Sequence, residues 1–251
     1  MVALLLLAVA TPLAAEHVPP TPDGIFELET VSRLFVDIEK WEPMLEVTGQ
    51  FEDEEFEFRY RALTLGSYYR FHRNVKAGAF YRVQAGARHD DDWVVLDNGD
   101  WEWQDTTSRA EHVLIADLTP RFLLDFIPGE NWVFALKNRY FFNTFNSQHS
   151  LLARPQLTYF WIRDRQPVLN VSAAYALYMA LNFSDQLIYQ RAPYVEALYH
   201  VTDSVKLTAG IARKTVHWSS SQDIDRVGDP DYSVDQTAWR ATVGAIFQLQ
   251  L

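Results

Sequence analysis

The chain of 251 residues carries 33 acidic and 22 basic residues, a formal net charge of −11, and no cysteine. The lack of cysteine excludes disulfides, a lipid-modified cysteine and thiolate metal sites. The acidic balance offers no basic surface for nucleic acid, so we expect no nucleic-acid partner. A mean hydropathy of −0.17 is too polar for a helical membrane protein. A β-barrel presents only alternate residues to lipid, so its average resembles that of a soluble protein.

The first segment, MVALLLLAVATPLAA, is apolar from Val2 to Ala10 and has small residues at Ala14 and Ala15. This pattern predicts a secretory signal peptide over residues 1–15, although a basic n-region is missing. A short N-terminal anchor helix is the alternative, and the shortness of the apolar run disfavours it. We therefore expect the protein to be exported.

Residues 16–41 are predicted to form an N-terminal periplasmic segment. Within it, DGIFELETVSRLFVDIEKW (23–41) places Ile25, Leu28 and Val31 on one stripe of a helix. We predict a short amphipathic helix that lies at the periplasmic rim or plugs the mouth of a barrel. An additional strand that begins near Phe26 is the alternative.

Residues 42–251 show a repeated alternation of apolar and polar positions, clearest in VLNVSAAYALYMAL (168–181). Every second residue from Leu169 to Leu181 is apolar, and the intervening row is smaller and contains Asn170 and Ser172. The run is too short for a membrane helix, which needs about 20 apolar residues. In a helix, residues two positions apart point to widely separated faces, so a period of two would not form one apolar face. The segment is therefore predicted to be a strand with one apolar face.

The same alternation predicts about ten strands, and the barrel is assigned to residues 42–251. We place the strands at 42–51, 55–71, 77–88, 112–127, 132–145, 150–162, 167–181, 187–201, 204–218 and 236–251. Short turn signals such as PGEN (128–131) alternate with long polar stretches. The predicted fold class is all-β, an antiparallel up-and-down transmembrane β-barrel, and about 8–12 strands are compatible with the pattern.

Strand parity predicts the topology. If the last strand ends in the periplasm, 128–131 and 163–167 are periplasmic, and the long stretches 88–111 and 219–235 lie outside, as the long loops of such barrels do. Three prolines, Pro120, Pro155 and Pro193, fall inside predicted strands. Because proline removes a hydrogen bond from the ladder, we expect each of them at a bulge.

The hairpins FALKNRYFFNTFNSQHSLLARPQLTYF and LIYQRAPYVEALYHV resemble those of small outer-membrane β-barrels of Gram-negative bacteria, in particular a barrel family of unknown function whose strands carry inward arginine pairs. The resemblance extends over roughly residues 42–251. It implies a fold and a location in the cell outer membrane, and it brings no catalytic residues. The chain departs from the commonest ending of such barrels, a Phe, because its last residue is Leu251.

The rows predicted to face the barrel interior are rich in basic residues. We expect a lumenal polar network in which the acidic side chains pair with the basic ones. Its predicted members are Arg59, Arg61, Arg82, Asp117, Arg121, Asp125, Lys137, Arg139, Arg154, Glu196, Lys206 and Arg240. One interpretation is a small anion-selective pore or a site for an anionic ligand. The favoured interpretation is an Arg/carboxylate network that fills a narrow barrel, because about ten strands are far fewer than the roughly 16–18 that leave a channel.

The acidic stretch 87–112 suggests two further kinds of site. Clustered carboxylates on loops are candidates for Ca²⁺ or Mg²⁺, here Asp90, Asp91, Asp92, Asp97 and Asp100. A solvated acidic loop is the favoured interpretation, and no other cofactor is expected. Ten-stranded outer-membrane proteases carry paired carboxylates and an Asp–His pair at the barrel top, a level at which His89 and His112 lie here. No other motif of that family is present, so no catalytic residue is assigned.

Three classes of function remain open. The favoured one is an integral outer-membrane barrel that serves as a structural or narrow-pore component of the envelope. The alternatives are a barrel-top hydrolase acting on lipid or peptide, and a soluble exported β-barrel that binds an apolar ligand. The expected partners are outer-membrane lipid and lipopolysaccharide, and the barrel-assembly machinery during insertion.

Overall fold

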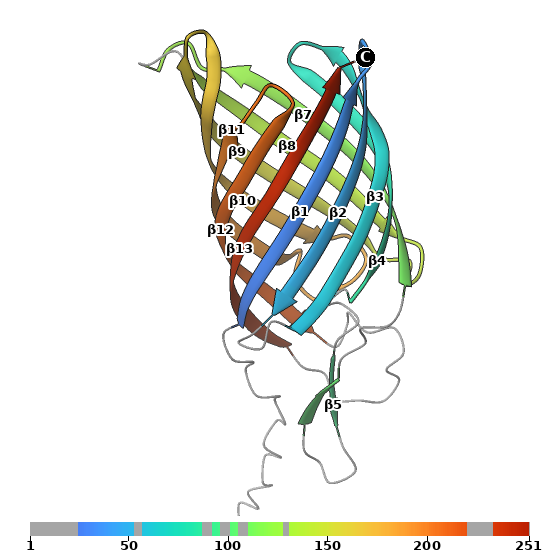
Figure 1. The fold of residues 1–251 in the computed structure, drawn as a ribbon. Coiled ribbons are helices and arrows are strands. Elements are labelled where there is room, and N and C mark those ends of the chain that lie inside the picture. The colour runs from blue at the N-terminus through green and yellow to red at the C-terminus, as the bar shows by residue number, and fades with distance from the viewer. Residues whose placement is uncertain are drawn as a thin grey trace, which may run out of the picture.

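The computed structural model describes residues 25–52, 57–86, 92–95, 101–104, 110–127, 131–219 and 233–250. Within these ranges every regular element is a β-strand, and no helix has the length and apolarity needed to cross a membrane. Eleven strands form a closed barrel, and two short strands pair separately (Figure 1). The predicted all-β barrel is confirmed, with one strand more than the ten placed from the sequence.

The strands are long, as a tilted barrel wall requires. They are β1 (Ile25–Asp37), β2 (Trp41–Glu52), β3 (Glu57–His72), β4 (Val75–Ala85), β5 (Asp92–Val95), β6 (Trp101–Gln104), β7 (Ala110–Leu123), β8 (Trp132–Asn143), β9 (His149–Arg163), β10 (Gln166–Ala180), β11 (Ile188–His200), β12 (Val205–Ser219) and β13 (Ser233–Gln250). β5 and β6 form the separate two-stranded sheet, and the other eleven form the wall.

The barrel closes by pairing its first strand with its last. Neighbouring strands of the wall are antiparallel, except that β1 runs parallel to β13, from Ile25 opposite Ala238 to Asp37 opposite Gln250. The other edge of β1 pairs with β2 in the usual antiparallel sense. An odd number of strands makes this parallel closure necessary, because alternating strands return to the same direction after an even number of reversals.

The helix predicted within residues 23–41 is wrong, because residues 25–37 form β1, and the barrel therefore begins at Ile25 rather than at residue 42. The spacing of Ile25, Leu28 and Val31 fits a helix as well as a strand. What decides between them is the pairing of β1 with β13 and β2, which leaves Phe26 exposed on the outside and Glu27 buried in the lumen.

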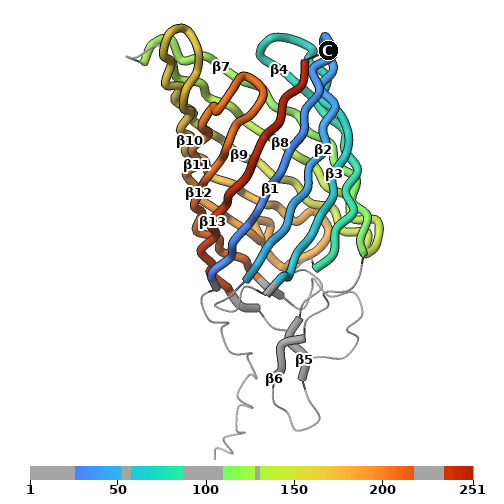
Figure 2. Tube along the Cα trace, viewed as in Figure 1, coloured from blue at the N-terminus to red at the C-terminus, as the bar shows by residue number. Residues whose placement is uncertain are grey.

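The two ends of the barrel differ. At one end lie the connections 38–40, 73–74, 164–165 and 201–204 and residues 124–127, together with the end of β13, and we call this the short-turn end (Figure 2). The opposite end, here the long-loop end, carries the described connections 144–148 and 181–187, and β1, β3, β7 and β13 start there. The predicted signal peptide and most of both long polar stretches lie outside the described residues.

The strand β10 shows how the sequence alternation becomes a wall. Val171 and Tyr175 are exposed on the outside of the barrel, whereas Asn170 and Ser172 are buried on the inside. The cross-strand partners of Ala173 are Val195 and Leu157, and these three outward residues extend the apolar surface over three strands. The strand predicted at 167–181 is confirmed.

Pro120, Pro155 and Pro193 do not produce register shifts. The shifts lie near Gln50/Phe51, Arg70/His72, Pro167/Leu169 and Tyr178/Met179. The bulges predicted at Pro120, Pro155 and Pro193 are therefore wrong. Each of these prolines instead lies where the ladder on one side lacks two pairs, as between Leu118 and Arg121 on the β8 side. A local gap accommodates the missing N–H without changing which face the later residues occupy.

Candidate functional site

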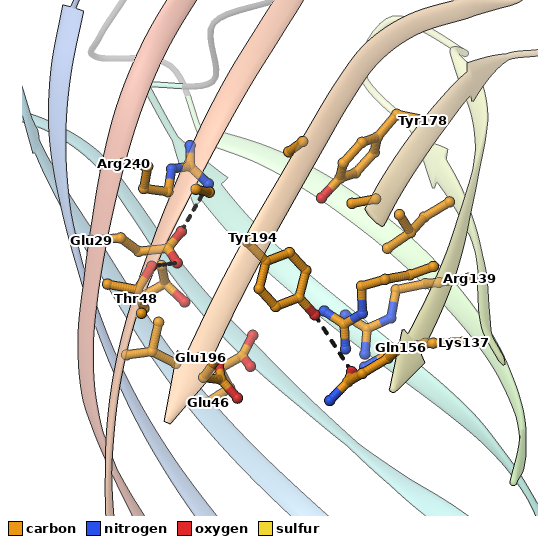
Figure 3. A pocket seen from close by; sticks show the side chains of 18 of the residues that line it. Glu29, Glu46, Thr48, Lys137, Arg139, Gln156, Tyr178, Tyr194, Glu196 and Arg240 are labelled. Atoms are coloured by element: carbon orange, nitrogen blue, oxygen red, sulfur yellow. Dashed lines mark hydrogen bonds and ion pairs between the residues drawn. The ribbon is translucent and has the colours of Figure 1, made fainter. Parts of the chain in front are cut away.

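The lumen contains a cavity of about 820 Å³, and it is the candidate functional site. Side chains near both ends of the wall line it, from Asn143 and Gln148 at the long-loop end to Lys76 and Lys206 at the short-turn end. Figure 3 shows Glu46 and Glu196 pointing into this cavity from one side and Lys137 and Arg139 from the other. Charge of both signs is therefore present in the lumen and is unevenly distributed around it.

The closing seam carries a buried ion-pair cluster. Glu27 on β1 lies directly opposite Arg240 on the parallel strand β13, and Nε of Arg240 donates to Oε2 of Glu27 at 2.7 Å. The ammonium of Lys214, on β12, donates to the other oxygen of Glu27. Nη1 of Arg240 also reaches Oε2 of Glu29 at 3.2 Å. Two cations and two carboxylates thus hold three strands together from the inside.

A second cluster follows around the wall, on β1, β2 and β4. Arg33 lies opposite Glu46, and its Nε donates to Oε2 of Glu46 at 2.6 Å. Arg82 lies 3.5 Å from the other oxygen of Glu46, and its Nε donates to the hydroxyl of Thr64 at 2.9 Å. One carboxylate therefore serves two guanidinium groups.

Acidic side chains also organise the two ends of the lumen. At the long-loop end Glu111 is fully buried, and its Oε2 accepts from the side-chain amides of Gln84 and Asn143. At the short-turn end Nζ of Lys76 donates to Oε1 of Glu42 at 3.0 Å. These contacts tie β7 to β4 and β8, and β4 to β2, so polar contacts continue along the inside of the wall.

The third cluster, on β7, β8 and β9, is the most basic. Nε of Arg139 donates to Oδ2 of Asp117 at 3.0 Å, and Nζ of Lys137 lies 3.5 Å from the same oxygen. Oδ1 of Asp117 accepts from the hydroxyl of Thr119 at 2.7 Å. Arg154 lines the cavity beside them and makes no ion pair with any residue that the structure describes.

Most of the predicted network members lie in the lumen. The structure places Arg59, Arg82, Asp117, Arg121, Lys137, Arg139, Arg154, Glu196, Lys206 and Arg240 on the inner side of the wall. The pairing expected for Glu196 is wrong within the described chain, because Glu196 makes no hydrogen bond or ion pair there. Lys206 donates to the side chain of Gln248 at 2.6 Å, and Arg59 lies 3.6 Å from Glu52.

Two predicted members lie elsewhere. Arg61 occupies the exposed outward row of β3 with Leu63 and Leu65, because both Arg59 and Tyr60 point inward beside the register shift and reverse the parity of the residues that follow. Asp125 lies in the exposed turn after β7, which ends at Leu123. The lumenal positions predicted for Arg61 and Asp125 are wrong.

Most of the predicted metal ligands lie outside the described residues. Asp90, Asp91, Asp97 and Asp100 lie outside the described residues, as does His89, and Asp92 begins β5. Among the described residues no group of three His, Asp or Glu side chains could hold a metal ion. His112 faces outward from β7, where its Nδ1 is hydrogen-bonded to the hydroxyl of Tyr81 at 2.5 Å.

Sequence reasoning missed most of the acids that pair in the lumen, namely Glu27, Glu29, Glu42, Glu46, Glu52 and Glu111. Glu27 and Glu29 are absent from the predicted network because a helix is predicted over residues that form β1. The alternation of FELET, with Glu27 and Glu29 between Phe26, Leu28 and Thr30, was the available signal. The predicted excess of basic over acidic residues in the lumen was accordingly too large.

Comparison with known proteins adds no family. No protein-family model matches the chain, and no curated protein matches it. The class that the fold defines is a closed β-barrel with a charged lumen.

Removal of the Glu27 charge tests the seam cluster. Glu27→Gln removes the buried carboxylate that Lys214 and Arg240 share, so it should destabilise the barrel by about 3–5 kcal/mol. The matched control is Glu196→Gln, the same change at a lumenal residue that has no ion pair with a described residue. The measurement is the denaturant midpoint of the full chain refolded in detergent micelles. Equal midpoints for both variants would contradict the role of the seam cluster.

Proposed function

We propose that the protein is an integral outer-membrane β-barrel that serves as a structural or narrow-pore component of the envelope, with a polar lumen. The observation that carries this proposal is the inverted distribution of polarity in the closed barrel. Outward Leu65, Val195 and Ile211 are 48–51% exposed, whereas inward Glu27 and Glu111 are 0% exposed. A barrel in water favours polar residues outside and apolar residues inside. A barrel in lipid requires apolar residues outside, as found here.

The height of the apolar surface supports the proposal. On β12 the outward row is Val205, Leu207, Ala209 and Ile211 from the short-turn end, and it turns polar at Arg213. This row, from Val205 to Ile211, spans seven residues of strand, which approaches the roughly 9–11 that cross the hydrocarbon core. The outward basic residues Arg61 and Arg191 also lie near the long-loop end, where they would meet lipid headgroups.

Polar and aromatic side chains border this surface at both ends. At the long-loop end the hydroxyl of Tyr140 is hydrogen-bonded to His149, and His217 contacts Asp185 and Asp235 at 2.8 Å each. At the short-turn end Trp41 and Trp161 are exposed. Amphipathic rings and hydrogen-bonded polar groups suit the two interfaces of a membrane. Outer-membrane lipid and lipopolysaccharide, and the assembly machinery during insertion, are the partners that follow from the proposal.

The lumen favours a narrow polar pore over a pocket for an apolar ligand, because charged side chains surround the cavity. A soluble exported barrel that binds an apolar ligand would need the opposite lining. Nothing among the described residues favours a barrel-top hydrolase, since His112 faces outward and is hydrogen-bonded to Tyr81. The polar cavity, which residues near both ends of the wall line, supports passage of small solutes rather than a filled interior.

Two alanines on the same face of β7 provide a matched test of the membrane proposal. Ala116 lies between the exposed Leu114 and Leu118, whereas Ala110 begins the strand at the long-loop end. Ala116→Arg should cost about 2–4 kcal/mol at the bilayer midplane, and Ala110→Arg about 0–1 kcal/mol near the interface. The measurement is the free energy of folding into phospholipid vesicles. Equal costs for the two substitutions would count against a lipid-facing β7.

Single cysteines test the orientation, because the chain contains none. We expect Gln186→Cys, in the connection 181–187, to react with a membrane-impermeant maleimide on intact cells, since long loops face outward in such barrels. Asp203→Cys, in the connection 201–204, should react only after the outer membrane is permeabilised. The opposite result would reverse the orientation, and labelling of both in a soluble fraction would overturn the membrane proposal.

A further inference from the structure

A pair of like charges faces the lumen between β8 and β9. Lys137 and Arg154 are Cα partners on these antiparallel strands, and both side chains line the cavity. Like charges directly opposite each other on one face of a sheet are destabilising. Arg139, two residues along the same face of β8, adds a third cation, so the arrangement calls for nearby negative charge.

The protein supplies only part of that charge. Asp117 lies 3.0 Å from Arg139 and 3.5 Å from Lys137, and its other oxygen is occupied by Thr119. Among the described carboxylates, Asp117 is thus the one within 4 Å of any of the three cations, and Glu46 and Glu196 line the same cavity without an ion pair to them. At the seam, by contrast, Lys214 and Arg240 face two carboxylates, Glu27 and Glu29.

Arg154 is the cation whose bonding is incomplete. Its Nε is buried and has no hydrogen-bond partner, and its guanidinium lies 5.6 Å from the ring centroid of Tyr194. The hydroxyl of Tyr194 donates to Oε1 of Gln156 at 3.5 Å (Figure 3). A buried donor without an acceptor is costly, and here the ring of Tyr194 and the amide of Gln156 border the same cavity.

We propose that Lys137, Arg139 and Arg154 form a binding site for a small oxyanion, a carboxylate or a phosphate, in the lumen. The planar guanidinium fork of Arg154 matches the two oxygens of such a group, and Lys137 provides a second charge across the ladder. An oxyanion here relieves the like-charge pair and gives the guanidinium of Arg154 a counter-charge, which no ion pair with a described residue provides. The inference names the solute class of the proposed pore and rests on that proposal for access to the lumen.

The first experiment measures binding apart from conductance. The denaturant midpoint of the full chain in detergent is followed while sodium phosphate, or sodium acetate, replaces sodium chloride at constant ionic strength. A ligand that binds the folded state raises the midpoint. We expect both oxyanions to raise it above the chloride value, and Arg154→Met to raise the apparent dissociation constant by at least about tenfold, as loss of a charged hydrogen bond implies. The two titrations show which oxyanion binds more tightly.

Matched variants separate a binding role from a structural one. Lys206→Met removes a lumenal cation at the short-turn end and should leave the oxyanion response unchanged. In chloride alone, Arg154→Met should be at least as stable as the native chain, because it removes a like-charge neighbour of Lys137. Equal midpoints in phosphate, acetate and chloride, or an unchanged phosphate response in Arg154→Met, would overturn the inference. If Arg154→Met does not fold, Lys137→Met carries the same comparison, with the same outcomes.

A conductance measurement distinguishes this inference from the proposed pore. We expect the reversal potential of the native chain in planar bilayers, under a salt gradient, to indicate anion preference, and this preference to weaken in Arg154→Met. Stabilisation by oxyanions without conductance would support the binding site and contradict the proposed pore. Conductance without an oxyanion response would leave the pore and remove the site.

Discussion

The parallel pairing of β1 with β13 is the constraint on which the rest of the structure depends. A sheet that is not closed leaves a row of unpaired N–H and C=O groups at each edge, which is an aggregation site in water and is not tolerated in lipid. Parallel ladders are slightly less stable per residue than antiparallel ones. In this barrel, side chains reinforce the weaker ladder from within, because Arg240 of β13 binds both Glu27 and Glu29 of β1.

The same closure determines how charge is distributed in the lumen. β1 and β2 bring Glu27, Glu29 and Glu46 to one part of the wall, where arginines on neighbouring strands bind them. On β8 and β9 the inward rows carry Lys137, Arg139 and Arg154, and Asp117 of β7 binds only the first two. Glu27 and Glu29 therefore hold the seam together, and on β8 and β9 the basic side chains outnumber the carboxylate that contacts them.

The sequence predicts the outer surface of the barrel better than its interior. A period of two identifies a row such as that of β10 from local residues alone, because lipid or solvent makes the same demand on every outward position. The seam is different. Residues 25–37 satisfy both a helical stripe and a strand, and the choice depends on a partner more than 200 positions away in the chain. The local alternation of FELET favours a strand, but it does not identify the partner strand that would confirm one.

Errors in the candidate site have equally physical origins. Arg59 and Arg61 share parity in the sequence, yet a register shift between Gln50 and Phe51 of the partner strand lets Arg59 and Tyr60 both point inward and turns Arg61 outward. A bulge therefore moves every later side chain of the strand to the opposite face of the sheet from the one that simple alternation predicts. The lumenal position predicted for Asp125 is wrong for another reason. The N–H of Leu124 donates to the carbonyl of Trp132, which ends the β7–β8 pairing before the aspartate.

The odd number of strands also determines which ends of the barrel the first and last strands reach. β1 begins at the long-loop end, and β13 finishes at the short-turn end, whereas a barrel with an even number of strands brings both to the same side. The predicted periplasmic position of residues 16–41 assumed an even barrel. In the observed wall, residues 25–37 instead run from one end of the barrel to the other. If the long loops face outward, β1 therefore enters the wall from outside the cell, and only its end near Asp37 lies on the periplasmic side.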